Sequence, residues 1–496
     1  MVRWELDWLE NRARLAPDSE AVIDADISMT WTYSELNNRC NRVANWLVEK
    51  GIRKGDRVAL LSPNDICYLD LLFACGKIGA IFVPLNWRLS TSEIRYILED
   101  STPKLLGYHS SFTKTVADLN EMNMELFKVE KESYFKDSGF TRDIPISEED
   151  PLAIIYTGGT TGKPKGVVLS HRSILWNGLN TILSWNLTSE DTTLTYMPMF
   201  HTGGLNALSI PLLMIGGKVV IAKEFDPHSA ICYLNKYQCT IVLFVPTMYH
   251  MLVETDEFKG TEFPTIKAFL SGGAPCPLEI YEAFNQKGLQ FKEGYGLTEA
   301  GPNNFFIETW MANEKRGSVG KPMMFNQIQL LKEDGTVAEN EEVGEVLIKG
   351  KHSFEFYWKN EDATKETLKQ GWLHTGDLAK RDNDGYFYIV GRKKDMIITG
   401  GENVYPLEVE HWIAAHPEVS EVAVVGLPDS KWGEIVTAFI VLKNNASLSV
   451  EEIKNYCSYK LGNYKIPKKI IFIKELPKTH VGKIDKNQLK QSVEAK

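Results

Sequence analysis

The sequence predicts an α/β protein. The predicted fold has a large N-terminal domain of stacked α/β sheets, a β-rich subdomain, and a small α+β C-terminal domain. Three observations lead to this prediction. The chain has 496 residues, which is longer than a domain with a single hydrophobic core usually is. Strand-like and helix-like patterns alternate over the first 390 residues, and the pattern changes near residues 391–395.

Short apolar runs closed by Pro, Gly or Ser mark the strands of the first domain. We expect a strand over 56–62, a helix over 68–77 and strands over 79–84, 240–246 and 266–271. Strands that alternate with helices form mostly parallel sheets, and ligands lie at the carboxyl ends of those strands. The motifs YTGGTTG, SGGAP and EGYGLTE each follow an apolar run, so we expect them to converge on one cleft.

A β-rich stretch containing GEVLIKG precedes the change near 391–395, with turns at 334–335 and 384–385. Beyond the change, the chain is expected to form a compact unit that ends in a basic tail. Its predicted elements are a helix over 406–416, strands over 421–426 and 435–442, and a helix over 450–461. We therefore place the domain boundary within 391–395.

Composition and charge narrow the class of protein. The net charge of −10 disfavours nucleic acid as the main partner. No stretch approaches the ~20 apolar residues of a membrane span, and the N-terminus has no apolar signal core. The seven cysteines are scattered without metal-binding spacing, so we expect reduced thiols and a cytoplasmic location.

The C-terminal end is basic although the whole chain is acidic. Residues 451–496 carry eleven lysines and five acidic residues. Such a run is either a solvated face or a surface that meets a polyanionic cofactor or an acidic membrane. Peripheral membrane contact therefore stays open, and so does the choice between a monomer and a homodimer.

The stretch YTGGTTGKPKG, residues 156–166, concentrates glycines, threonines and lysines. Glycine N–H groups can form an anion-binding nest, threonine hydroxyls can donate to phosphate, and lysine adds positive charge. The stretch fails the P-loop pattern, because Pro164 follows Lys163 and Thr157 stands five residues before Gly162. It is either a phosphate loop of another design or a flexible turn between two strands.

Further motifs follow in order along the chain: PMFHTGG at 198–204, SGGAP at 271–275, YGLTE at 295–299, GEV at 344–346, GWLHTGD at 371–377, GR at 391–392, GGENVYP at 400–406 and PKTHVGK at 477–483. Together they resemble the adenylate-forming superfamily of acyl-CoA synthetases, adenylation domains and luciferases, from about residue 10 to 490. Stretches such as GLPDSKWGE and YKIPKKIIF are most similar to bacterial fatty-acyl-CoA synthetases.

The resemblance implies a two-step ligase that uses ATP, Mg²⁺ and coenzyme A. A carboxylate attacks the α-phosphorus of ATP to give acyl-AMP and pyrophosphate, and the thiol of coenzyme A then displaces AMP. The resemblance also implies an AMP-binding domain over 1–391, a hinge over 392–395 and a mobile C-terminal domain over 396–496.

By the same resemblance, residues 157–166 cradle the β- and γ-phosphates. Gly158 stands where the family most often has serine, so one hydroxyl is missing, although the glycine N–H remains. The implied ligands are Thr157, Gly158, Gly159, Thr160, Thr161, Gly162 and Lys165, and Thr160 is also assigned to the metal.

Residues 295–299 match the family's adenine and metal positions. Tyr295 matches the aromatic side chain that stacks on adenine; its alternative is a core tyrosine beside a tight turn at Gly296. Thr298 matches the contact to the α-phosphate, and Glu299 matches the Mg²⁺ ligand. The edge of the base would be lined by Gly272, Gly273 and Ala274.

The GWLHTGD and GR motifs match contacts to the sugar. Asp377 matches the carboxylate that accepts both ribose hydroxyls, and Arg392 matches the arginine at the ribose or phosphate. Trp372 either walls the nucleotide site or is a core residue.

The C-terminal motifs match mobile parts of the family's site. Lys483 matches the lysine that bridges the carboxylate and the α-phosphate when the small domain closes. Lys394 matches the hinge about which that domain rotates between the two steps. Gly400 and Gly401 would then line the pantetheine channel, while lysines of the small domain meet the phosphates of coenzyme A.

His201 matches the position that gates the acyl pocket, although a lone histidine is often a core residue. Amino-acid-activating relatives place an Asp beside this position, and Phe200-His201-Thr202 offers no carboxylate. The walls that we expect are neutral and give no cation for a second carboxylate: Gly203, Gly204, Leu205, Val245, Pro246, Ser271, Gly301 and Pro302.

We therefore expect a monocarboxylic acid as substrate, and a fatty acid first. An aryl-type CoA ligase of the succinylbenzoate or coumarate kind is the second hypothesis. The third is a protein that loads acyl-AMP onto a carrier or senses nucleotide. The presence of Lys483 and Glu299 argues against a sensor.

Overall fold

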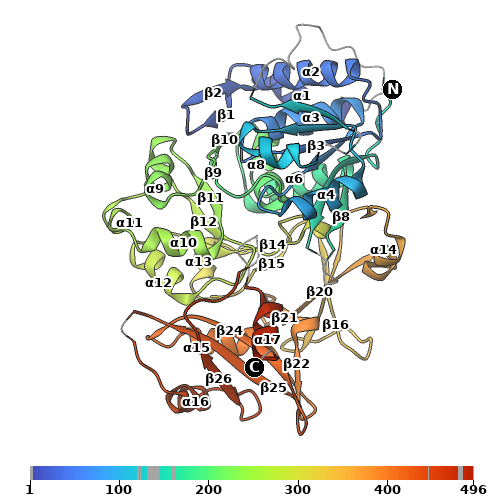
Figure 1. Cartoon of the computed structure of the whole chain (residues 1–496). Coiled ribbons are helices and arrows are strands. Elements are labelled where there is room, and N and C mark those ends of the chain that lie inside the picture. The colour runs from blue at the N-terminus through green and yellow to red at the C-terminus, as the bar shows by residue number, and fades with distance from the viewer. Residues whose placement is uncertain are drawn as a thin grey trace.

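The computed structural model describes residues 4–119, 122, 124–130, 144–158, 163–444, 446–478 and 484–494. A large N-terminal body of sheets and helices fills the upper part of Figure 1, and a smaller C-terminal domain lies below it. Antiparallel strands including β16 and β20 lie between the two. The predicted fold class is confirmed.

The largest sheet has the strand order β18-β8-β7-β4-β3-β5-β6, and its edge strand β18 is Phe356–Tyr357. Its parallel strands are β3 (Arg57–Leu61), β4 (Ile81–Pro84), β5 (Leu105–Tyr108), β6 (Glu125–Lys128) and β7 (Pro151–Thr157). β8 (Lys165–Ser170) returns antiparallel to β7, with Thr157 opposite Lys165. The stretch 156–166 therefore joins the two strands of a hairpin, which is an antiparallel exception in a mostly parallel sheet.

Amphipathic and apolar helices pack against this sheet: α2 (Tyr33–Glu49), α3 (Cys67–Ile78), α4 (Thr91–Ser101) and α6 (His171–Trp185). α2 and α4 begin with capping boxes, Thr32 with Glu35 and Ser90 with Glu93, which satisfy free N–H groups of the first turn. α3 is buried along nearly its whole length and ends at Gly79, whose φ is 72°. The predicted helix over 68–77 and the strands on either side of it are confirmed.

Two smaller sheets complete the α/β part. One has the order β2-β1-β10-β9, formed by β2 (Met29–Thr32), β1 (Glu20–Asp24), β10 (Lys218–Ile221) and β9 (Thr192–Thr195). The other has the order β11-β12-β13. β11 (Ile241–Phe244), β12 (Ala268–Ser271) and β13 (Phe291–Glu293) are parallel. Helices α10 (Pro246–Val253) and α12 (Leu278–Gln286) pack beside them over an aromatic core that includes Tyr249 and Phe284. The strands predicted over 240–246 and 266–271 are confirmed.

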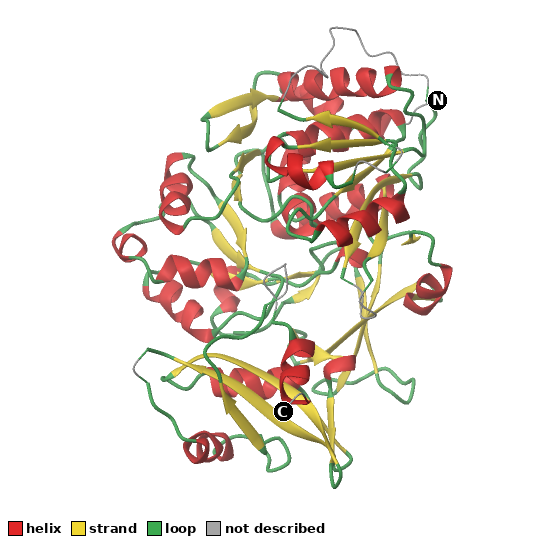
Figure 2. Ribbon diagram, viewed as in Figure 1, coloured by secondary structure: helices red, strands yellow, loops and turns green. Residues whose placement is uncertain are grey.

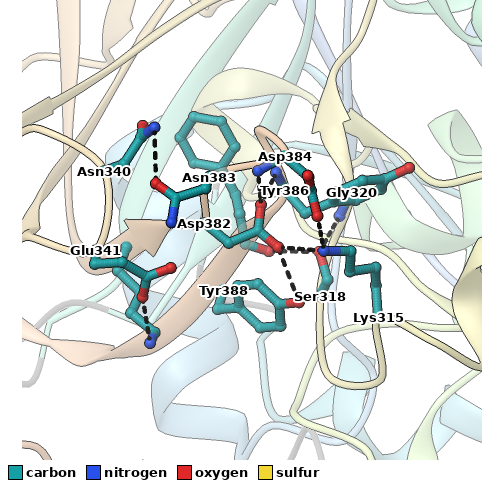
Figure 3. Close-up of polar contacts among 12 residues, drawn as sticks. Lys315, Ser318, Gly320, Asn340, Glu341, Asp382, Asn383, Asp384, Tyr386 and Tyr388 are labelled. Carbon is teal, nitrogen blue, oxygen red and sulfur yellow. Dashed lines mark hydrogen bonds and ion pairs between the residues drawn. The ribbon is translucent and has the colours of Figure 1, made fainter.

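The β-rich subdomain is an antiparallel sheet of β16 (Gln327–Leu331), β17 (Val343–Lys349), β20 (Trp372–Arg381), β21 (Phe387–Arg392) and the short β19 (Leu368–Lys369). Figure 3 shows how the β20–β21 turn is anchored. Lys315 Nζ lies 2.9 Å from Asp382 Oδ2 and 2.5 Å from Asp384 Oδ2, and Asp382 also accepts from Tyr386 N. The hairpin is thus fixed at its tip.

The C-terminal domain is an α+β unit whose sheet contains β22 (Ile397–Thr399), β23 (Glu402–Val404), β24 (Val419–Asp429), β25 (Gly433–Leu442) and β26 (Lys469–Phe472). Helices α15 (Pro406–Ala414) and α16 (Val450–Ser458) end a few residues before the predicted bounds. The expected basic tail is in fact structured, since β26 pairs with β25 and α17 (Lys486–Glu494) follows. Figure 2 shows these helices around the long β24–β25 ribbon.

In the described part of the chain, no helix combines the length and the apolar character that crossing a membrane requires. All seven cysteines are free thiols, and Cys232 alone among them is exposed.

Candidate active site

Two glycine-rich loops are tied together beside the hairpin of 156–166. Gly294 N, after β13, donates to Ser271 O at the end of β12 over 2.8 Å. The 3-10 turn η4 (Thr298–Ala300) lies against β8. Lys165 Nζ is 5.1 Å from the ring centroid of Tyr357, whose hydroxyl reaches Glu299. The base of the 156–166 hairpin and the loops after β12 and β13 therefore meet at one side of the molecule.

Glu299 is held by a tyrosine that the sequence analysis missed. Tyr357 OH donates to Glu299 Oε1 over 2.7 Å, and Phe354 N donates to Glu299 O over 2.7 Å. Burial raises the pKa of Glu299 above its ordinary value, while the hydrogen bond from Tyr357 opposes that rise. A half-buried carboxylate with one neutral donor is poised to accept a cation.

The aromatic and ribose positions form one cluster. Tyr295 OH donates to Asp377 Oδ2 over 2.6 Å, and Arg392 Nε lies 3.2 Å from Asp377 Oδ1. Asp377 is 8% exposed, so its negative charge needs these partners. Burial raises the pKa of Tyr295 well above its ordinary value, and the Asp377 carboxylate adds to that rise. Tyr295 is therefore a neutral donor.

A tight turn aims Tyr295 and Glu299. A Cβ at Gly296 would lie 2.0 Å from Pro302 O, so only glycine fits there. Asn304 N donates to Tyr295 O over 3.1 Å and closes the loop. Thr298 is buried at the start of η4, one residue before Glu299.

A cavity of about 330 Å³ lies beside Glu299 and opens toward the β17–β20 strands. It is mostly polar, and its lining residues are Leu297, Glu299, Glu345, Tyr357, Glu366, Thr367, Lys369, His374, Thr375, Gly376 and Lys393. Both carboxylates and cations border this space, as a charged ligand with a counterion requires.

The side chains around Glu299 are suited to binding Mg²⁺. The described residues contain no cluster of three or more His, Cys, Asp or Glu side chains placed to hold a metal. Magnesium is commonly bound by one or two carboxylates while nucleotide phosphates and water supply the other oxygens. Glu299, whose half-buried carboxylate accepts from Tyr357 OH, fits that pattern.

Several predicted residues lie at the margins of this region. Gly272, Gly273 and Ala274 follow β12, and Gly273 adopts a φ of 83°. Trp372 begins β20, five residues before Asp377, and Lys349 Nζ lies 5.7 Å from the centroid of its ring. Of the phosphate loop, Thr157 and Gly158 are described at the hairpin, whereas Gly159, Thr160, Thr161 and Gly162 fall outside the described residues, as does Lys483.

His201 precedes helix α7 (Thr202–Asn206), and its ring lies 4.5 Å from the ring of Phe200. The Arg88 guanidinium lies 5.9 Å from the Phe200 ring and 4.9 Å from that of Trp87. A cation is therefore near the predicted acyl gate, whereas the walls expected from the sequence were all neutral. The spacing of Arg88, more than a hundred residues before His201, gave no signal for this proximity.

The hinge and channel residues lie in and beyond the link to the C-terminal domain. Lys394 is exposed in the 3-10 turn η5 (Lys393–Asp395) that follows β21. Gly400 and Gly401 adopt φ values of 61° and 85° in the turn between β22 and β23. Gly400 N donates to Trp432 O over 2.8 Å.

Comparison with known proteins identifies the family of the chain. The AMP-binding enzyme family model matches residues 9–358, and the model of the AMP-binding enzyme C-terminal domain matches residues 408–483. The chain is 37% identical over 484 residues to a feruloyl-CoA synthase of Amycolatopsis sp, with 98% of each chain covered. It is 36% identical over 496 residues to the long-chain-fatty-acid–CoA ligase FadD13 of Mycobacterium tuberculosis, again with 98% of each covered.

A solved structure is similar over the whole length. The o-succinylbenzoate coenzyme A synthetase of Bacillus subtilis, in complex with ATP and a magnesium ion, superposes with a TM-score of 0.88 at 34% identity. The match covers 98% of this chain and 99% of that one. The chain therefore belongs to the AMP-binding enzymes, the adenylate-forming superfamily that its motifs resemble.

Proposed function

We propose that the chain converts a monocarboxylic acid into its coenzyme A thioester through an acyl-adenylate. It is an AMP-forming acid–thiol ligase, and it uses ATP, Mg²⁺ and coenzyme A. One observation carries the proposal: Tyr295 and the half-exposed Arg392 are joined to the buried Asp377 by a hydrogen bond and an ion pair, near Glu299. This cluster can hold a nucleoside with its phosphates directed toward a cation.

Asp377 suits the ribose because a carboxylate has about four acceptor positions, and only two are committed to Tyr295 and Arg392. The two remaining acceptor positions match the two adjacent hydroxyls of a ribose, which can donate to one carboxylate together. The ring of Tyr295 is then assigned to adenine, since its hydroxyl fixes the ring against Asp377.

Glu299 is the residue that we assign to Mg²⁺. When bound there, Mg²⁺ would neutralise charge on the phosphates and screen the charge that develops as pyrophosphate leaves. The hydrogen bond from Tyr357 OH orients the carboxylate oxygens of Glu299 that would bind the metal, and Lys165 lies next to Tyr357. Lys165, at the base of the 156–166 hairpin, is thus close to the phosphates that Glu299 would serve.

The C-terminal domain offers a surface for coenzyme A. Lys468 Nζ lies 3.4 Å from the ring centroid of Trp432, and Lys431 Nζ lies 5.1 Å from it. Trp432 is 40% exposed and touches Gly400 through the backbone. An aromatic face with two ammonium groups suits an adenine that carries phosphates. This supports our assignment of small-domain lysines to the phosphates of coenzyme A.

The acid remains the open part of the proposal. A fatty acid is our first candidate, and an aromatic acid is the second, because the feruloyl-CoA and succinylbenzoate relatives act on acids of that class. Arg88 near Phe200 also makes a second carboxylate on the substrate worth testing.

The test is AMP release from a panel of acids, each assayed with and without coenzyme A. The panel holds fatty acids of graded length, cinnamic and benzoic acids, an indole acid and a dicarboxylate. We expect coenzyme A-dependent AMP release with at least one class of acid. Activity on aromatic acids alone would select the second candidate. Sustained turnover without coenzyme A would instead favour loading of a carrier.

A further inference from the structure

The turn that carries Asp377 leaves the regular β-ladder. β17 and β20 pair at Glu345 with Leu378 and resume at Leu347 with His374. Between these pairs, one residue of β17 faces the three residues 375–377 of β20. Such a bulge re-aims a side chain, and here it turns Asp377 toward Tyr295. Gly376 adopts a φ of 72°, which a side chain would resist.

A bulge also removes ladder partners from backbone groups, which must find others when they are buried. Thr375 Oγ1 donates to Val346 O over 2.8 Å, and Asp377 N donates to Thr375 Oγ1 over 3.0 Å. Gly376 N donates to Glu345 Oε1 over 3.2 Å. The turn is therefore closed by its own threonine and by the Glu345 carboxylate.

Glu345 is itself held in place. Its side chain is 10% exposed, and Lys393 Nζ lies 3.3 Å from its Oε2. His374 Nδ1 lies 3.6 Å from Oε1. A buried carboxylate needs such partners to offset its lost hydration. Lys393 directly follows Arg392, which pairs with Asp377, so two consecutive cations hold two carboxylates on the neighbouring strands β17 and β20.

We propose that Glu345 is a positioning residue for the ribose of ATP. Its carboxylate fixes Gly376 in the bulge and thereby sets the direction of Asp377, while Lys393 balances its charge. This inference rests on the proposed role of Asp377 as the acceptor of the ribose hydroxyls. Glu345 acts through the turn, without touching the nucleotide.

The experiment compares the dissociation constants of ATP and 2′,3′-dideoxy-ATP by titration calorimetry on the full chain. We expect the unmodified protein to prefer ATP and Asp377→Ala to lose that preference. Glu345→Ala should reduce the preference by at least about fivefold, because a misdirected Asp377 gains less from the hydroxyls. Glu345→Gln keeps an acceptor oxygen for Gly376 N and should stay within about twofold of the unmodified protein.

Glu361→Ala is the matched control, because its side chain is 88% exposed in an ion pair on α14 (Glu361–Thr367). It should leave the preference unchanged. If Asp377→Ala keeps the preference for ATP, the ribose role of Asp377 fails, and with it this part of the proposed function. If Asp377→Ala loses the preference and Glu345→Ala keeps it, the inference about Glu345 alone is overturned.

A purely structural role would give a different pattern. Glu345→Ala would then lower the melting temperature while the preference stayed that of the unmodified protein, and this result would also overturn the inference. Should Glu345→Ala fail to fold, Glu345→Asp carries the test. Its shorter side chain keeps the charge but withdraws the oxygen from Gly376 N, so we expect a partial loss of preference. An unchanged preference in that variant would contradict the inference.

Discussion

The proposed nucleotide site of the N-terminal body and the proposed coenzyme A surface of the C-terminal domain are built differently. Tyr295, Asp377 and Arg392 are interlocked by hydrogen bonds and an ion pair, and Asp377 is buried. Trp432 and Lys468, by contrast, stand on an exposed surface next to the two left-handed glycines of the β22–β23 turn. The cluster around Asp377 is preorganised for a ligand, whereas Trp432 and Lys468 form an open surface.

The link between the two regions agrees with this difference. Lys443 of the C-terminal domain pairs with Glu279 of the N-terminal body over 3.1 Å, and both side chains are about half exposed. Such surface pairs contribute about 0–1 kcal/mol. A preorganised site lowers the cost of binding ATP, whereas a weakly held domain can change position between two half-reactions.

Of the variants discussed, Lys483→Ala should have the largest effect, and this effect should fall on the first half-reaction. We expect acyl-AMP formation to fall on the order of 10³-fold, because the ammonium stabilises charge on the reacting carboxylate and phosphate. Thioester formation from supplied acyl-AMP should survive. Separate assays of the two half-reactions measure this, and an equal loss in both would contradict the delivery of Lys483 for the first step alone.

Lys394→Pro tests the hinge. Proline fixes φ and removes a backbone donor, so rotation about residue 394 should be blocked. We expect thioester formation to fall by about tenfold or more, while ATP–pyrophosphate exchange stays within about twofold. Lys394→Ala removes the same side chain but retains a free φ, and it is the matched control. Loss of exchange in the proline variant would show that residue 394 serves the preorganised half instead.

Tyr357→Phe tests how firmly the metal end is preorganised. The variant removes the hydroxyl that donates to Glu299 but keeps the ring against Lys165. We expect the Mg²⁺ concentration for half-maximal activity to rise by about tenfold, with a smaller change in kcat at saturating Mg²⁺. A magnesium titration of the first half-reaction measures both. An unchanged titration would show that Glu299 needs no orienting partner.

Glu293 gives the smallest effect, on stability. Glu293 directly precedes the 294–299 loop. Tyr281 OH and Cys276 N donate to its carboxylate. Burial raises the pKa of Glu293 to about 7. Its contribution is therefore full below the ordinary pKa of 4.5 and is lost as pH rises through about 7. Between pH 4.5 and 8, Glu293→Gln should gain about 3 kcal/mol of unfolding free energy relative to the unmodified protein.

Thermal unfolding at several pH values measures that gain. Glu282→Gln, at a position 59% exposed on the same helix as Tyr281, is the control and should show no such trend. A constant difference between Glu293→Gln and the unmodified protein would contradict the assignment of a raised pKa.

Much of the fold was predictable because the apolar runs are short and end at glycine or proline, as in β3, β4, β11 and β12. The antiparallel β7–β8 hairpin was less so, because strand direction depends on tertiary pairing that a local pattern does not encode. α17 was missed for a similar reason: its lysines resemble a solvated tail, while Leu489 packs against the sheet.

The site divides in the same way. Tyr295, Glu299, Asp377 and Arg392 could be predicted as site residues because each belongs to a family motif, and the structure brings Tyr295 and Arg392 to Asp377. Glu345 and Tyr357 were missed, although the GEV motif contains the first of them. Their importance comes from contacts across the fold, to Gly376 and Glu299, which no local spacing predicts.

The most direct test of the preorganised site is acid-dependent ATP–pyrophosphate exchange in the unmodified protein and in Asp377→Ala, with an acid that the panel identifies. We predict exchange that requires both acid and Mg²⁺, together with a rise in the KM for ATP of about tenfold or more in the variant. Exchange that ignores the acid, or a variant with the KM of the unmodified protein, would contradict the assignment of this pocket to adenylate formation.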